Sequence, residues 1–237
     1  MIYDSDLAYI HHVGYGSFSG RAATGLLERL LQAGISSGRV VDVGCGGGHW
    51  LRRLVDAGYD AVGIEPSAGL VSQARALVPE AEIFEASAYE RVLPSCRAIT
   101  SLGEVLCYFV ESSPPPMSDF LRKAADALEP GGLLVFDVIV TGEPSLDAKT
   151  WRAGDDWAVL VEVKEHRDQG LLEREIITFR QVEGHYRRGT ETHRQAVWSA
   201  EEIESWLGEA GFTGILRIDA YGDQPMLPRR QAFCATR

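Results

Sequence analysis

Short apolar runs in this chain alternate with longer segments in which apolar residues recur every three or four positions. The short runs are typical of buried strands, and the longer segments are typical of amphipathic helices. Helices are expected at Gly20–Ala33, His49–Ala57, Ser67–Leu77, Met117–Leu128 and Ala200–Ala210. Strands are expected at Arg39–Val43, Ala61–Ile64, Ala81–Phe84, Ala98–Leu102, Leu133–Val138, Ile215–Ala220 and Ala232–Ala235. This alternation predicts an α/β fold: a doubly wound, mostly parallel seven-stranded sheet with helices on both faces.

After the fifth of these strands, apolar and polar residues begin to alternate at every second position. Such runs occupy Trp157–Lys164, Leu171–Gln181 and Thr190–Trp198, and the turn Asp168-Gln169-Gly170 separates the first two. This period is typical of antiparallel strands with one solvated face. The expected segments are an N-terminal helical flap (1–38), a Rossmann-like core (39–142), an antiparallel insertion acting as a substrate lid (143–198), and a C-terminal helix with strands that complete the sheet (199–237).

A loop made almost entirely of glycine, Gly44-Cys45-Gly46-Gly47-Gly48, joins the first expected strand to a helix. Glycine lets the backbone approach a ligand closely, and the following helix N-terminus faces that ligand. A phosphate-binding P-loop would end in Lys and Ser or Thr, where this chain has His49-Trp50. A dinucleotide fingerprint begun at Gly44 places His49 where its third glycine belongs. The spacing that fits is Asp42-x-Gly44-x-Gly46-x-Gly48.

This spacing resembles the first motif of class I S-adenosylmethionine (SAM)-dependent methyltransferases. Glu65 ends the second strand about 20 residues past the loop, where doubly wound folds place the acid that holds ribose hydroxyls; alternatively, Glu65 caps the helix that begins near Pro66 and Ser67. The segment Leu128–Leu134 is similar to the late turn-and-strand motif of the family, so the resemblance covers residues 39–142. It implies SAM as methyl donor and S-adenosylhomocysteine (SAH) as product.

By this resemblance, the cofactor site lies at the carboxyl ends of the strands, and an N-terminal segment closes over it. Many relatives carry Asp before the residue that borders the adenine, whereas this chain has Glu85-Ala86-Ser87. Ser87 could instead be the N-cap of a short helix near Tyr89–Leu93. The cofactor-binding residues expected are Asp42, Gly44, Cys45, Gly46, Gly48, Glu65, Pro66, Ala86, Ser87, Leu102, Gly103, Tyr15 and Phe18.

Candidate residues for proton transfer and for acceptor binding lie in three segments. The N-terminal segment supplies His11 and His12, of which only one can face a pocket, and the loop after the fourth strand supplies Glu104 and Tyr108. The insertion carries an ionisable cluster at 185–194, which is either an acceptor site or a solvated hairpin with cross-strand charge pairs. The catalytic candidates are His11, His12, Glu104 and His193, and the substrate-binding candidates are Tyr108, Tyr186, Arg188 and Arg194.

Charge and cysteine usage narrow the range of partners. The 237-residue chain has a formal net charge of −11, which disfavours nucleic acid and anionic membranes. Its first residues are acidic, and no apolar stretch is long enough to span a bilayer. The four cysteines, Cys45, Cys96, Cys107 and Cys234, lack metal-ligand spacing, so we expect no metal site and reduced thiols in a cytoplasmic protein.

The sequence therefore predicts an enzyme that transfers a methyl group from SAM to a small-molecule acceptor by in-line displacement. A general base is needed only if the acceptor nucleophile carries a proton at neutral pH, so a nitrogen, oxygen or carboxylate acceptor stays open. Two alternatives remain. One is a non-catalytic SAM- or SAH-binding regulatory protein. The other is an NAD(P)-dependent oxidoreductase, which His49 in the fingerprint disfavours.

Overall fold

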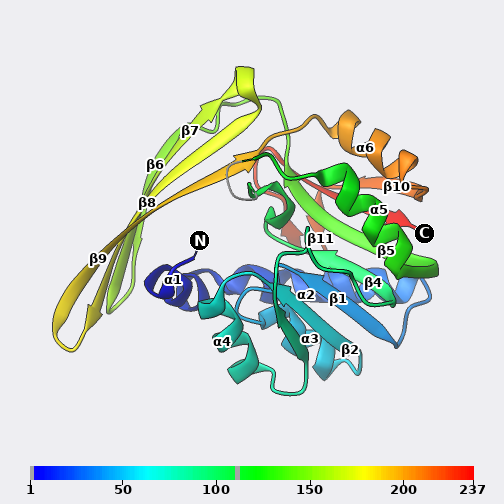
Figure 1. The fold of residues 1–237 in the computed structure, drawn as a ribbon, viewed down its shortest axis with the longest axis horizontal. Coiled ribbons are helices and arrows are strands. Elements are labelled where there is room, and N and C mark those ends of the chain that lie inside the picture. Colours follow the sequence, from blue (N-terminus) through cyan, green and yellow to red (C-terminus); the bar gives the residue numbers. More distant parts are fainter. Residues whose placement is uncertain (1–2, 110–112) are drawn as a thin grey trace.

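The main sheet has seven strands in the order β10-β13-β5-β4-β1-β2-β3 (Figure 1). The computed structural model describes residues 3–109 and 113–237. The strands are β1 (Arg39–Val43), β2 (Asp60–Glu65), β3 (Glu82–Glu85), β4 (Cys96–Ser101), β5 (Leu128–Ile139), β10 (Thr213–Ile218) and β13 (Arg230–Thr236). The strands from β5 to β3 pair in parallel, and β13 is antiparallel to both of its neighbours. The prediction of a mostly parallel seven-stranded sheet is confirmed.

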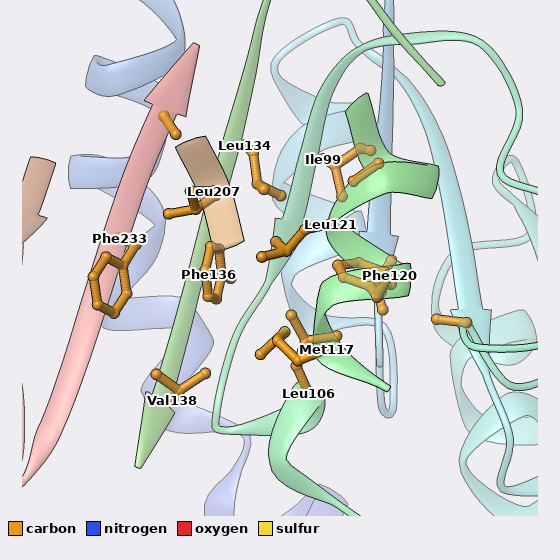
Figure 2. Close-up of a cluster of buried hydrophobic side chains, with 14 of the residues drawn as sticks. Ile99, Leu106, Met117, Phe120, Leu121, Leu134, Phe136, Val138, Leu207 and Phe233 are labelled. Atoms are coloured by element: carbon orange, nitrogen blue, oxygen red, sulfur yellow. The ribbon is translucent and has the colours of Figure 1, made fainter. Parts of the chain in front are cut away.

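Helices cover both faces of this sheet, because successive strand residues are buried on opposite sides. The helices are α1 (Ser5–Tyr15), α2 (Ser17–Gln32), α3 (His49–Asp56), α4 (Ala68–Leu77), α5 (Met117–Ala127) and α6 (Ala200–Glu209). One core lies between the sheet and α5 with α6, where Phe120 and Leu121 of α5 face Phe136 of β5 (Figure 2). The other core joins the opposite face to α2, α3 and α4. Among the helices of the described residues, none has the length and apolar character that crossing a bilayer requires.

A separate antiparallel sheet follows β5, as predicted, and it has four strands where three were expected. Its strands are β6 (Ala148–Ala153), β7 (Trp157–His166), β8 (Leu171–Val182) and β9 (His185–Ala196), paired in that order. The sheet projects beyond the core and passes over α1 (Figure 1). Leu7 and Ile10 of α1 pack against Trp157, Val159 and Ile176 of its inner face. This antiparallel sheet is therefore joined to the core through the N-terminal helix.

Several elements differ from the sequence expectations. No helix was expected before Gly20, but Ser5–Tyr15 forms α1, which Asp4 caps. Gly14 of α1 lies so close to Trp157 that a Cβ would be 2.8 Å from its ring. Tyr89–Leu93 forms no helix; Ser87 Oγ instead accepts the Tyr89 amide in a turn. Strand β6 was missed because its residues are mostly exposed and do not alternate. The hairpin of β11 (Ala220–Tyr221) and β12 (Gln224–Pro225) was also missed, and two short 3-10 helices lie at Val105–Cys107 and Arg167–Gln169.

Candidate functional site

A cavity of about 710 Å³ opens at the carboxyl ends of β1, β2 and β4, beneath α1 and the antiparallel sheet. Cavities of this size are typical of cofactor and small-molecule sites. It brings together residues that lie far apart in the sequence. The expected residues among its lining are His11, Tyr15, Phe18, Gly44, Cys45, Gly46, Glu65, Pro66, Ser87, Leu102, Gly103, Glu104 and Tyr108.

The glycine loop is shaped by packing on one side and is open on the other. Gly44 adopts a φ of +70°, and a Cβ there would lie 2.3 Å from Val105 Cγ1. Gly46 adopts a φ of +54°, but a Cβ there would meet open space in the cavity. A non-glycine residue at either position would be strained, since L side chains disfavour positive φ. The loop therefore presents bare backbone to the cavity, as a cradle for a ligand requires.

Glu65 ties the glycine loop to the start of α4. Its buried carboxylate accepts the Gly46 amide at 3.1 Å and the Ser67 amide at 2.9 Å. Burial raises the pKa of Glu65 to about 7, although both amide hydrogen bonds oppose the rise. The helix cap is Ser67, whose Oγ accepts the Leu70 amide at 3.3 Å. Glu65 therefore lies in the cavity wall with its charge partly compensated, and the capping of α4 falls to Ser67.

Three expected cofactor residues lie behind the cavity lining. Asp42 is buried and accepts from Thr100 Oγ1 at 2.8 Å, and Thr100 in turn accepts from Trp50 Nε1 at 3.0 Å. Burial raises the pKa of Asp42 to about 7. Gly48 packs close to Ala74, and Ala86 packs against the core beside the α5 face, so that Ser87 and Ala88 border the cavity in its place. Asp42, Gly48 and Ala86 support the site from outside it.

Glu104 is held as a carboxylate at the end of the cavity farther along the sheet. It accepts from Arg174 Nη2 at 2.9 Å, from Gln195 Nε2 at 3.2 Å, and from Arg230 Nε. Burial alone would raise its pKa, but Arg174 and Arg230 outweigh burial and hold the pKa below its usual value. Glu104 therefore stays ionised, and its position suits an anchoring role better than proton transfer.

Asp137 also lines the cavity and is absent from the residues expected from the sequence. It accepts the Gly103 amide at 3.0 Å, the Glu104 amide at 2.7 Å and the Tyr221 hydroxyl at 2.9 Å. Burial raises its pKa to about 6. The sequence did contain an indication of this role, because Asp137 is the charged residue in the otherwise apolar run Leu133–Val138. A carboxylate in a buried strand is unusual and therefore points to a specific role.

Glu191, in the ionisable cluster of β9, holds Tyr3 and Asp4 in place. Glu191 accepts the amides of Tyr3 and Asp4 at 2.8 and 2.9 Å, and contacts His193 Nε2 at 2.8 Å. His193 is buried outside the cavity lining, with its ring against those of Tyr3 and Tyr108. The Tyr3 and Tyr108 hydroxyls lie 3.1 Å apart in the cavity wall. His193 is thus placed to position two cavity residues.

The two adjacent histidines of α1 face different surroundings. His11 lines the cavity, and burial, followed by the neighbouring His49, His12 and His193, lowers its pKa to about 4. His12 lies behind the glycine loop, where it stacks on His49 at 4.6 Å and leaves no room for a Cβ on Gly47. Only His11 of this pair is therefore placed to accept a proton from a molecule in the cavity.

Three expected acceptor residues lie outside the cavity. Tyr186, 63% exposed, Arg188 and Arg194 occupy exposed positions on β9, and Arg194 pairs with Glu173 across the sheet at 2.9 Å. The expectation that they bind the acceptor is wrong, because alternation along β9 turns them away from the face that carries Glu191 and His193. Arg152 of β6 and Arg230 of β13 line the cavity instead. They come from elements that no local pattern linked to the site.

The site and fold together define a methyltransferase. A family model described as "Methyltransferase domain" matches residues 15–216. A protein of Geobacillus sp. (strain WCH70) with a provisional methyltransferase name is 29% identical over 195 residues, covering 77% of this chain and 76% of that protein. A solved S-adenosylmethionine-dependent methyltransferase from Clostridium acetobutylicum ATCC 824 superposes with a TM-score of 0.81 at 16% identity, covering 97% of this chain and 96% of that one. The sugar N-methyltransferase KedS8 from Streptoalloteichus sp ATCC 53650 gives 0.79 at 21% identity, covering 100% and 96%.

The chain belongs to the methyltransferase-domain family, since the family model spans most of its length. The prediction of a methyltransferase is confirmed by the family model, and the solved SAM-dependent methyltransferase from Clostridium acetobutylicum shares the predicted fold. The oxidoreductase alternative finds no support in these matches.

Proposed function

We propose that this enzyme methylates a small-molecule acceptor within the cavity at the carboxyl ends of β1, β2 and β4. The observation that carries the proposal is that the glycine loop, Glu65 and Ser87 share one continuous cavity with His11, Tyr108 and Arg230. A donor bound to the first group would place its nucleoside at the ends of β1 to β3, which leaves the remainder for the acceptor. The solved neighbour that acts on a sugar supports an acceptor of small-molecule size.

The residues present fit SAM. Glu65 offers carboxylate oxygens to ribose hydroxyls, Gly44 to Gly47 offer bare backbone to the amino-acid part, and Ser87 with Ala88 borders the adenine. Pro66, Leu102 and Gly103 complete the wall, and Tyr15 with Phe18 covers it from α1 and α2. When bound, SAM supplies an activated methyl group on a cationic sulfur.

The protein's own contribution is alignment, exclusion of water and proton acceptance. Positioning of two reactants can contribute roughly 7–11 kcal/mol to lowering a barrier. The antiparallel sheet and α1 form the lid over the cavity, fixed by the Glu191 contacts to Tyr3 and Asp4. His11, neutral at pH 7 and open to the cavity, is placed to take the proton of a hydroxyl nucleophile. Glu104 anchors Arg174 and Arg230, and His193 positions Tyr108 and Tyr3. The buried thiols fit the reducing compartment expected from the sequence, the cytoplasm.

Calorimetry with SAM, SAH and NADH tests this proposal. Binding of SAM and SAH but not NADH is expected, and Glu65→Ala should weaken SAH binding roughly 10- to 100-fold, because a charge-assisted hydrogen bond is lost. Glu82→Ala on β3, an exposed carboxylate that does not line the cavity, is the matched control. A methyl-transfer screen with radiolabelled SAM across phenols, carboxylates and amines then tests for catalysis. Absence of SAH binding, or unchanged affinity in Glu65→Ala, would contradict the assignment.

A further inference from the structure

Two carboxylates line the acceptor end of the cavity, defined here by Tyr3, His11, Tyr108, Glu104, Asp137, Arg152 and Arg230. Both already accept several hydrogen bonds. Glu104 accepts from two arginines and Gln195, and Asp137 accepts from two backbone amides and Tyr221. A protonated amine needs a carboxylate with free lone pairs. Among the described residues, both carboxylates at this end of the cavity already accept hydrogen bonds from protein groups.

The cations at the same end are less fully compensated. Arg230 is largely buried, and its Nε donates a hydrogen bond to Glu104. Its Nη1 is also buried but has no hydrogen-bond partner among the described residues. Glu104 is shared with Arg174, so one carboxylate faces two guanidinium groups. A buried donor without a partner is unfavourable and is normally satisfied by a ligand or by water.

Arg152 adds a second cation at the entrance. It lies on β6, and its guanidinium carbon is 5.0 Å from the centre of the Tyr15 ring, a cation–π contact. It forms no ion pair with a carboxylate in the part of the chain that the structure describes. Its register partner on β7 is Val159, which is buried on the face toward α1, so the Arg152 side chain starts from that same face.

The proton balance also disfavours an amine. An ammonium group must lose its proton before its nitrogen can attack, and at neutral pH only a small fraction of an alkylamine is unprotonated. A carboxylate needs no base, and a hydroxyl loses its proton as the new bond forms. The acceptor expected here therefore differs from that of the neighbour KedS8, whose name, sugar N-methyltransferase, states a nitrogen acceptor.

We propose that the acceptor carries an anionic group, a carboxylate or a phosphate, which binds to Arg230 and is drawn in by Arg152. The inference rests on the proposed function, because it assumes that the other end of the cavity holds the methyl donor. It makes Arg230 and Arg152 the residues that select the acceptor by charge.

Probes that differ mainly in charge test this inference. Benzoate, phenyl phosphate, benzyl alcohol and benzylamine are titrated into the SAH-saturated protein and followed by NMR. Benzoate or phenyl phosphate should bind roughly 10-fold or more tightly than benzylamine, and the tighter of the two distinguishes a carboxylate site from a phosphate site. Arg152→Glu should weaken binding of the tighter anion by roughly 2- to 5-fold and strengthen that of benzylamine.

The matched control is Arg53→Glu, an exposed arginine of α3 outside the cavity lining, which should leave all four affinities unchanged. Arg152 is exposed, so the charge reversal Arg152→Glu should leave the fold intact. Binding data for Arg230→Met are interpreted only if circular dichroism shows that this variant is folded. Equal or tighter binding of benzylamine, failure of both anions to bind, or an equal effect of the two charge reversals would overturn the inference. Calorimetry with SAH on the same samples separates these outcomes from failure of the proposed function, in which SAH itself does not bind.

Discussion

The carboxylate of Glu65 accepts a hydrogen bond from the backbone amide of Gly46 at 3.1 Å. The two residues belong to consecutive β–α connections, and this bond joins the glycine loop to the end of β2. The acid therefore has two tasks in the proposed site. It fixes the loop that receives the amino-acid part of the donor, and it presents its remaining lone pairs to the ribose.

The affinity for SAH should depend on pH through Glu65. Its pKa is raised to about 7 in the free protein, and ribose hydroxyls donate to the ionised form, so binding strengthens as pH rises through 7. We expect the dissociation constant at pH 6 to be about 10-fold larger than at pH 8. Calorimetry at a series of pH values, with Glu65→Gln as comparison, measures this. A pH dependence that is the same in Glu65→Gln would assign it to another group.

The same raised pKa acts in the opposite direction on the stability of the unliganded protein. The folded state holds the Glu65 proton more tightly than the unfolded state, so this contribution is complete below the unfolded pKa of 4.5. It is lost as pH rises toward 7. Ligand binding and folding therefore favour opposite protonation states of one carboxyl group.

Alanine substitutions in the glycine loop should separate packing from ligand approach. Gly44→Ala places a Cβ 2.3 Å from Val105 at a positive φ, and we expect it to lower the free energy of unfolding by roughly 2–4 kcal/mol. Gly46→Ala meets open space and should cost about 1 kcal/mol from its φ alone. SAH binding should nevertheless weaken in Gly46→Ala, because the methyl group enters the cavity. Urea unfolding and calorimetry measure both effects; equal stability losses would show that the loop relaxes away from Val105.

Local pattern was sufficient for the glycine loop and for Glu65, because both follow buried strands at a spacing that the fold imposes. It failed for Arg230 and Arg174, since each meets Glu104 across at least 70 positions of sequence. The β9 cluster shows the same limit. Alternation along β9 places Glu191 and His193 on one face, but nothing in the sequence indicated that this face would contact Tyr3 and Asp4. Alternation also places Arg194 on the other face, which is incompatible with a shared acceptor site.

Removal of the Glu104 charge should destabilise the protein strongly. Glu104→Gln leaves Arg174 and Arg230 facing each other in a largely buried site, and we expect a loss of about 3–5 kcal/mol of unfolding free energy. The double variant Glu104→Gln/Arg174→Met should recover part of that loss, since it removes one uncompensated charge. Glu201→Gln, which breaks an exposed pair with Arg217, is the control and should leave the stability nearly unchanged. Equal losses at Glu104 and Glu201 in urea unfolding would show that the buried cluster is well hydrated.

His11 should make the folded protein sensitive to acid. Its pKa is about 4 in the folded state, against an ordinary histidine pKa of 6.5 in the unfolded chain, so the unfolded state binds a proton first as pH falls. Stability is therefore lost between pH 6.5 and 4, by at most roughly 3 kcal/mol. His11→Gln carries no titrating group and should lose less stability over that range, whereas His185→Gln, at an exposed position on β9, should behave like the native protein. Thermal and urea unfolding at pH 7.5, 6 and 5 test this prediction. If His11→Gln and the native protein lose stability in parallel, His11 has the same pKa in the folded and unfolded states. That outcome would remove the argument that His11 is held neutral in the cavity.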